Sequence, residues 1–347
     1  MLPAVAGAAV VLAVMIEGFE TVVLPRLITR PVRLTRYFYS STWRAWSFTV
    51  CGAVPPGRRR ETLLSLYGPL SLIVLLGIWA ALMVLGFGLI YFSLGTGALK
   101  TFAGGGFPRC LYFSGTTFFT LGLGDVLPQA GAAKALTVLE SGLGFGFLAV
   151  VISYLPALNQ FFYRRETEIS ILGSRVGQPP SASEILDKHI AGGNLEVLRQ
   201  LLYDWERWAA EVHESHLSYP VLAYFRSEHE EQSWVAALAA VLDSCAFVIA
   251  GVEGACKCQA ELTFAMASHT AADLARVLRC PPEDPPIERL PPVELARLRA
   301  WISQKGLPLS GEKEMWERLA GLRPRYEPYL HALAVRFHLE LPPWVRR

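Results

Sequence analysis

The sequence has little charge, and its most apolar segment has none. Charged residues make up 18% of the 347 residues, and hydrophobic residues make up 52%. No charged residue occurs between Leu63 and Leu94, a stretch longer than the roughly 20 residues that a helix needs to cross a bilayer. This composition disfavours a wholly soluble globular protein and favours a membrane protein.

The sequence also lacks the common motifs of catalytic and nucleotide-binding domains. No Gly-x-Gly-x-x-Gly follows a strand, and no phosphate-binding or calcium-binding loop is present. No Lys or Arg precedes the first apolar stretch, so we do not expect a cleaved secretory signal. The six cysteines are scattered, and Cys256-x-Cys258 has no second pair at ligand spacing, which favours buried thiols over a zinc site. We therefore expect no enzyme, no cofactor and no nucleic-acid partner.

The charge that is present is divided unevenly along the chain. Up to Arg165 there are 13 basic and 5 acidic residues, whereas the remainder has 19 basic and 25 acidic residues. A basic apolar half followed by an acidic half predicts a membrane domain joined to a soluble domain. We expect the membrane domain in the plasma membrane and the soluble domain in the cytosol.

Two spans and an outward loop are predicted in the membrane half. The spans run from about Thr62 to Leu94 and from about Ala132 to Leu158, and Gly95 to Gly131 joins them. Arg58-Arg59-Arg60 precedes the first span and Arg164-Arg165 follows the second, so both flanks are expected in the cytoplasm. The Gly-rich loop then faces outward.

Residues 1–25 are expected to form a third helix. We favour a spanning helix with Glu17 and Glu20 near its cytoplasmic end, kept tolerable by snorkelling or by an Arg partner. A helix lying at the interface is the alternative. Arg30, Arg33 and Arg36 repeat every third residue, but Pro31 interrupts them, so a basic segment facing anionic lipid is favoured over a voltage sensor.

The outward loop contains a short helix followed by a Gly-rich segment. Pro108 can occupy the first turn of a helix, and the apolar stretch from Arg109 to Phe119 would dip into the membrane without crossing it. Glycines at alternate positions after Thr120 permit a row of inward-pointing carbonyls that could replace the water shell of a cation. The candidate ion-binding residues are Thr120, Leu121, Gly122, Leu123, Gly124 and Asp125.

Tyr112-Phe113-Ser114 and the segment from Thr116 to Asp125 resemble the pore loop of potassium channels, whose filter usually has the sequence Thr-Val-Gly-Tyr-Gly-Asp. Residues 62–158 look like the two-helix pore unit of that superfamily. The resemblance implies a homotetramer in the lipid bilayer that conducts potassium ions passively, with no other metal. Leu123 replaces the usual tyrosine and Phe119 a common threonine, so we expect softer selectivity for potassium over sodium. A non-selective cation channel and a non-conducting membrane sensor are the alternatives.

Three residues of the second span are candidates for gating. By the same resemblance, Gly144 falls at the hinge of the inner helix, although close packing is an equal alternative. Pro156 is expected to kink or end the helix near the cytoplasmic mouth. Glu140 is costly at membrane depth and is expected to brace the filter from behind or to pair with Lys134.

Helical spacing of apolar residues predicts an all-α soluble half, with a linker over Gly173–Ser183 and a Pro-rich linker from Pro281. His213 and His216, with Glu211 and Glu214, could share a metal, but a solvated or capping helix end is favoured. No cytosolic regulator is identifiable, and oligomer assembly or gating control is the hypothesis. The predicted divisions are an N-terminal helix and basic segment, a pore domain, a helical domain and a C-terminal helical segment, over 1–61, 62–165, 166–280 and 281–347.

Overall fold

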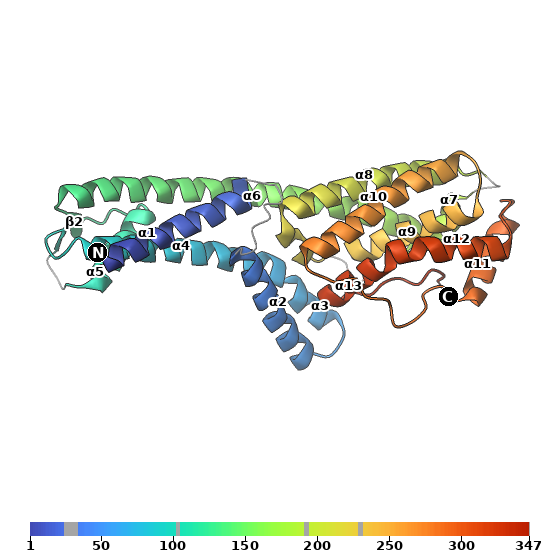
Figure 1. Ribbon diagram of the computed structural model, residues 1–347, viewed down its shortest axis with the longest axis horizontal. Coiled ribbons are helices and arrows are strands. Elements are labelled where there is room, and N and C mark those ends of the chain that lie inside the picture. The colour runs from blue at the N-terminus through green and yellow to red at the C-terminus, as the bar shows by residue number, and fades with distance from the viewer. Residues whose placement is uncertain (24–33, 102–104, 191–193, 228–231, 347) are drawn as a thin grey trace. The chain divides into compact units, whose positions relative to one another are not determined.

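The computed structural model describes residues 1–23, 34–101, 105–190, 194–227 and 232–346 (Figure 1). The chain divides into two compact units. Unit 1 contains residues 1–56 and 66–159, and unit 2 contains residues 57–65 and 160–347. The boundary at residue 159 lies close to the predicted end of the pore domain at 165, whereas the two predicted C-terminal divisions fold together in unit 2.

Unit 1 consists of helices and one short strand pair, and α6 continues from it into unit 2. Three helical stretches that begin in or run through unit 1 are long and apolar enough to cross a membrane, as the sequence predicts. The elements are α1 (Leu2–Gly18), the π-helical turn η1 (Phe19–Val23), α2 (Leu34–Ala53), α4 (Tyr67–Ser93), β1 (Leu99–Thr101), α5 (Phe107–Phe118), β2 (Val126–Pro128) and α6 (Gly131–Val176).

The N-terminal helix α1 packs along α4 (Figure 1). Gly7 makes this approach possible, because a Cβ at this position would lie 2.4 Å from the carbonyl oxygen of Gly86. At the other end of α1 the Oε1 atom of Glu17 accepts hydrogen bonds from the backbone N–H of Thr35, at 2.7 Å, and from the Thr35 hydroxyl, at 2.5 Å. Among the described residues, the first turn of α2 thus supplies the hydrogen-bond donors to this buried carboxylate.

Helix α2 was not expected from the sequence, which predicted only a basic interfacial segment there. Its buried face packs on the start of α4: Tyr67 donates a hydrogen bond to the carbonyl of Tyr39 at 3.0 Å and packs edge-on against Trp43. Arg36 lies on this helix, whereas Arg30 and Arg33 of the arginine repeat lie outside the described residues.

Helix α6 is longer than predicted. It passes through Pro156 without ending and continues to Val176. Of the two expectations for Pro156, that it ends the helix is wrong, and that it kinks the helix stays a prediction. A proline inside a helix removes one backbone hydrogen bond, but the rest of the ladder can carry the helix past it. The linker consequently begins at Gly177, and the predicted linker residues from Gly173 to Val176 are helical.

A two-stranded antiparallel pair closes the base of the outward loop. Strands β1 and β2 pair Leu99 with Pro128 and Thr101 with Val126. The pair was not predicted, and it ties the chain before α5 to the chain that follows the Gly-rich segment.

Unit 2 is helical throughout its described residues, apart from turns and connections. Neither the helix over Arg58–Ser65 nor the helix over Glu327–Phe337 was predicted. The elements are α3 (Arg58–Ser65), the last part of α6, α7 (Ala182–His189), α8 (Glu196–Ser218), the 3₁₀ turn η2 (Pro220–Tyr224), α9 (Trp234–Gly251), α10 (Ala255–Val277), α11 (Pro292–Gln304), α12 (Glu312–Leu322), the 3₁₀ turn η3 (Arg323–Arg325) and α13 (Glu327–Phe337).

Helix α9 is the centre of unit 2. It is also apolar and long enough to cross a membrane, but 94% of its residues are buried among the other helices of this unit. Its one acidic residue, Asp243, is fully buried and pairs with Arg289 at 2.6 Å, while the Tyr326 hydroxyl donates to it, also at 2.6 Å. Burial raises the pKa of Asp243 to about 6. This pairing joins the Pro-rich segment and η3 to the core.

A second buried cluster surrounds Arg165 in unit 2. The sequence predicted this residue only as part of a basic flank. Its guanidinium is buried and donates to the carbonyls of Leu222, at 3.0 Å, and Phe225, at 2.7 Å. It also lies 3.1 Å from the Nε2 atom of His216, whose Nδ1 atom lies 2.9 Å from the Val212 carbonyl. A neutral imidazole with its proton on Nδ1 satisfies both contacts.

The His216 cluster predicts a pH dependence of stability. Burial, and then the neighbouring Arg165, hold the pKa of His216 well below 6.5 in the folded chain. Below about pH 6.5 the histidine binds a proton in the unfolded chain but not in the folded chain. The free energy of unfolding therefore decreases as the pH falls below this value, by about 1.4 kcal/mol per pH unit. Chemical unfolding of the detergent-purified chain, followed by tryptophan fluorescence, measures this effect. His216→Gln should give a shallower dependence between pH 6.5 and 5, and parallel curves for both proteins would contradict the assignment.

Candidate functional site

The site begins with α5, the short helix predicted from Pro108 onward. Gly106 precedes it with a φ of +95°, and Pro108 lies in its first turn. One face of the helix is buried, with Phe113 packed edge-on against Tyr91 of α4 at 5.0 Å between ring centroids. The Ser114 hydroxyl lies 2.9 Å from the carbonyl oxygen of Val84, also in α4. Helix α5 is therefore fixed to α4, the first long span.

The backbone after α5 alternates between two conformations. Thr120, Gly122 and Gly124 have φ values of +56°, +58° and +79°, whereas Leu121 and Leu123 do not lie in the left-handed region. Alternating left- and right-handed residues let successive carbonyls point to one side, which a strand or a helix does not permit. The sequence predicts this left-handed conformation for the two glycines. Thr120 was not expected to share it, and for a side-chain-bearing residue the conformation costs roughly 1–2 kcal/mol.

The amides of this segment are held by the last turn of α5. The carbonyl oxygen of Thr116 accepts from the N–H of Leu121 at 2.8 Å and from that of Gly122 at 3.4 Å. The Thr117 carbonyl accepts from the N–H of Thr120 at 3.0 Å. Because the amides point back to the helix, the carbonyl oxygens are available on the other side of the chain.

Asp125 is fixed at the outer end of the segment. Its Oδ2 atom accepts a hydrogen bond from the Tyr112 hydroxyl at 2.9 Å, and its Oδ1 atom accepts from the backbone N–H of Val126 at 3.1 Å. Tyr112 lies in the middle of α5, so this hydrogen bond joins the helix to the end of the segment that follows it. Tyr112 belongs to the segment that resembles the potassium-channel pore loop, but no role was predicted for it from the sequence. Phe118, at the end of α5, is buried against Phe147, whereas Phe119 is largely exposed.

Two residues of α6 lie directly behind α5. Gly144 packs on the C-terminal end of α5 so closely that a Cβ would lie 1.9 Å from the carbonyl oxygen of Phe118. Glu140 is fully buried and forms a short hydrogen bond with Ser114. It forms no ion pair with Lys134, although the structure describes both residues. The Ser114 hydroxyl therefore faces Val84 of α4 and Glu140 of α6 at the same time.

The whole segment from Thr120 to Asp125 is exposed in a single chain. The side chains of Leu121 and Leu123 are 62% and 63% exposed. Helix α6 likewise exposes large apolar residues, including Val138 and Phe145. Irregular backbone at membrane depth is tolerated only where protein buries it or water lines it, so a single chain leaves this site incomplete.

The ligand sets of the two metal sites considered from the sequence, Cys256 with Cys258 and His213 with His216, are not brought together in the structure. Cys256 is buried, and burial raises the pKa of its thiol to about 11, while Cys258 is exposed. Among the described residues no third ligand joins this pair. His216 faces Arg165 and not His213, so those two histidines cannot share an ion.

Residues 79–160 match the model of an ion-channel family. This stretch is similar to ion-channel pores. It contains most of α4, the whole of α5, the Gly-rich segment and α6 as far as the unit boundary. The match supports a potassium-channel-like superfamily for this region.

The chain is also 30% identical over 206 residues to YdjJ, an uncharacterized membrane protein of Bacillus subtilis (strain 168). The match covers 57% of the chain and 57% of this relative, whose name assigns it no activity. No solved structure matches the chain. The predicted fold class is confirmed: this is a helical membrane protein with a potassium-channel-like pore region, an additional N-terminal helix and a helical C-terminal unit.

Gly144→Ala should disturb the contact between α6 and α5. The added methyl group overlaps a backbone atom that cannot rotate away, and overpacking of this kind costs roughly 1–3 kcal/mol. Thermal unfolding in detergent measures the loss. Gly77→Ala on α4 is the matched control, because nothing lies within 4 Å of the Cβ it adds. Equal melting temperatures for the two variants would show that the close contact does not matter.

Tyr112→Phe should loosen the outer end of the Gly-rich segment by removing the hydroxyl that binds Asp125. The expected result in single-channel recording is a shorter open time, with unchanged expression and melting temperature. Tyr163→Phe, which removes the hydroxyl of an exposed tyrosine on α6, is the control. Identical open times in both variants would show that the Tyr112 hydroxyl does not stabilise this end of the Gly-rich segment.

Proposed function

We propose that the chain is one subunit of a tetrameric channel that conducts potassium ions passively across the membrane. The observation that carries this proposal is the alternating backbone at Thr120, Gly122 and Gly124. The carbonyls of Thr116 and Thr117 hold the amides of its first three residues, Thr120 to Gly122. A row of free carbonyl oxygens can replace the water shell of an ion as it passes.

Several copies are needed because one loop cannot surround an ion. Closed cyclic symmetry is the usual way for identical subunits to enclose an axis, and the resemblance to potassium channels implies four copies. The exposure of Leu121, Leu123 and the apolar face of α6 supports this proposal, since neighbouring subunits would cover these side chains.

The ion path would use three chemical features in order. Asp125 offers a carboxylate near the outer end, which attracts cations toward the mouth. The carbonyls of Thr120 to Gly124 then bind the dehydrated ion, and the Thr120 hydroxyl adds an oxygen at the inner end. The C-terminal end of α5, with its partial negative charge, stabilises a cation on the inner side.

Selectivity for potassium over sodium is proposed to be present but softer than in channels with a filter tyrosine. Leu123 cannot donate a hydrogen bond, so the brace in the upper part of the segment is limited to the bond between Tyr112 and Asp125. A less rigid row of carbonyls discriminates less between ions of different radius.

The location follows from the basic flanks. Arg58-Arg59-Arg60 and Arg164 support a cytoplasmic position for both ends of the pore unit, in a plasma membrane. Unit 2 would then lie in the cytosol, where it is available for assembly or for control of gating.

Flux from purified protein in liposomes tests conduction. Wild-type protein should release a potassium gradient, and Gly122→Ala should reduce the flux to that of empty liposomes, because alanine is strained at a φ of +58°. Gly77→Ala should conduct like the wild type. Absence of flux from wild-type protein at every voltage and pH would favour the non-conducting sensor.

Reversal potentials under bi-ionic conditions separate the two kinds of channel. We expect permeability to potassium to exceed that to sodium. Equal permeabilities would leave a non-selective cation channel.

A further inference from the structure

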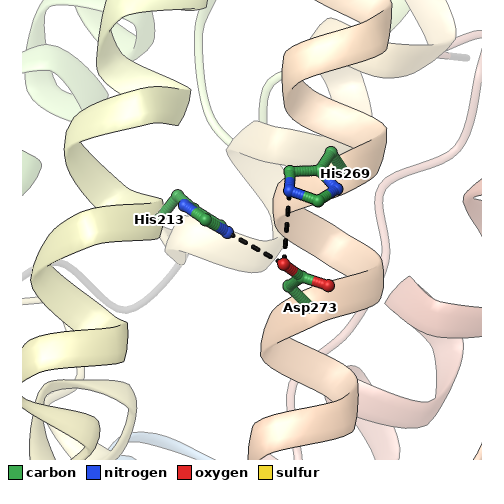
Figure 2. A group of neighbouring side chains, drawn as sticks. All are labelled: His213, His269 and Asp273. Carbon is green, nitrogen blue, oxygen red and sulfur yellow. Dashed lines mark hydrogen bonds and ion pairs between the residues drawn. The ribbon is translucent and has the colours of Figure 1, made fainter. Parts of the chain in front are cut away.

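Three potential metal ligands converge on one side of unit 2 (Figure 2). His213 projects from α8, and His269 and Asp273 project from α10, where they lie one turn apart on the same face. One ligand atom from each residue lies within 4.8 Å of the other two. The sequence analysis named only His213, because the other two residues lie more than 50 positions further along the chain.

The distances suit a small tetrahedral ion. The Oδ2 atom of Asp273 lies 3.2 Å from the Nε2 atom of His213 and 3.2 Å from the Nε2 atom of His269. Bonds of about 2.0–2.1 Å from zinc to nitrogen or oxygen, at the tetrahedral angle, separate two ligand atoms by roughly 3.3–3.4 Å. The two pairs that include Asp273 are therefore close to the separation that a bound ion requires, and the ligand atoms of the two histidines lie within 4.8 Å of each other.

Neighbouring side chains orient these ligands, and one side of the cluster is open to solvent. Arg276 forms an ion pair with the other oxygen of Asp273, Oδ1, so that the carboxylate is oriented with Oδ2 toward the histidines. The side chains of His213 and Asp273 are mostly buried, at 11% and 16% exposure. The His269 side chain is 59% exposed, which leaves one side open to solvent and to a water ligand.

We propose that His213, His269 and Asp273 bind one divalent transition-metal ion, with Zn²⁺ the best match, and that water completes the coordination. Two imidazoles and one carboxylate form a donor set that favours zinc, cobalt and nickel over calcium and magnesium, which prefer oxygen alone. A bound ion would join α8 to α10 within unit 2. This site is independent of the proposed ion path.

Calorimetric titration of the detergent-purified full chain with ZnCl₂ tests the proposal, with an affinity tag that contains no histidine and after removal of metals with EDTA. Wild-type protein should bind one zinc ion per chain and melt at a higher temperature when zinc is present. His269→Ala should weaken binding at least tenfold, since even the loss of residues that only support metal ligands costs about 10–100-fold. Because His269 is largely exposed, this variant should keep the melting temperature of metal-free wild-type protein.

Two control variants locate the site. His331→Ala removes a histidine from α13, and Cys258→Ser removes the exposed thiol on α10; neither should change zinc binding. Substitution of Co²⁺ should give visible d–d absorption without a thiolate charge-transfer band. The proposal is overturned if wild-type protein binds no zinc, if His269→Ala binds as tightly as wild type, or if Cys258→Ser abolishes binding. None of these outcomes bears on conduction, which is measured separately by flux.

Discussion

The pore region depends on the hydrogen bonds that the last turn of α5 makes to the chain that follows it. Backbone without regular secondary structure is costly at membrane depth, because each unpaired amide loses water without gaining a partner. The carbonyl of Thr116 accepts from Leu121 and Gly122, and that of Thr117 accepts from Thr120. These bonds place the amides on one side, and the left-handed residues between the leucines allow the carbonyls to occupy the other. The same residues that complete the helix thus prepare the surface proposed to bind ions.

Much of the rest of unit 1 keeps α5 in place. Ser114 joins it to Val84 on one span and to Glu140 on the other, and Gly144 allows α6 to lie against the Phe118 carbonyl. Strands β1 and β2 tie the loop together at its base. On the far side of α4, α1 adds a further layer through the contact at Gly7. Gly144 therefore has a packing role in this structure, and its predicted role as a hinge stays a prediction.

The local features of the pore were accessible from the sequence. Uncharged stretches predict the spans, Pro108 marks the start of α5, and alternate glycines predict left-handed backbone. Contacts between distant residues were not accessible, because periodicity reports which face of a helix is buried but not what covers it. The bond from Tyr112 to Asp125 and the approach of His213 to Asp273 are of this kind.

At two residues, Pro156 and Arg165, the structure differs from the sequence-based prediction for local reasons. Pro156 was expected either to kink or to end the helix, and α6 continues past it, because the loss of a single hydrogen bond need not end a long helix. Arg165 was predicted only as part of a basic flank, and its burial, which the carbonyls of Leu222 and Phe225 make favourable, was not foreseen.

The central claim is that several copies of the segment from Thr120 to Gly124 surround one ion path. Single-particle electron microscopy of the detergent-purified chain in potassium chloride tests this most directly. The account predicts a four-fold assembly in which the carbonyls of this segment face the symmetry axis, with ion density between them. A monomer, or an assembly in which the segment faces lipid or points away from the axis, would contradict it.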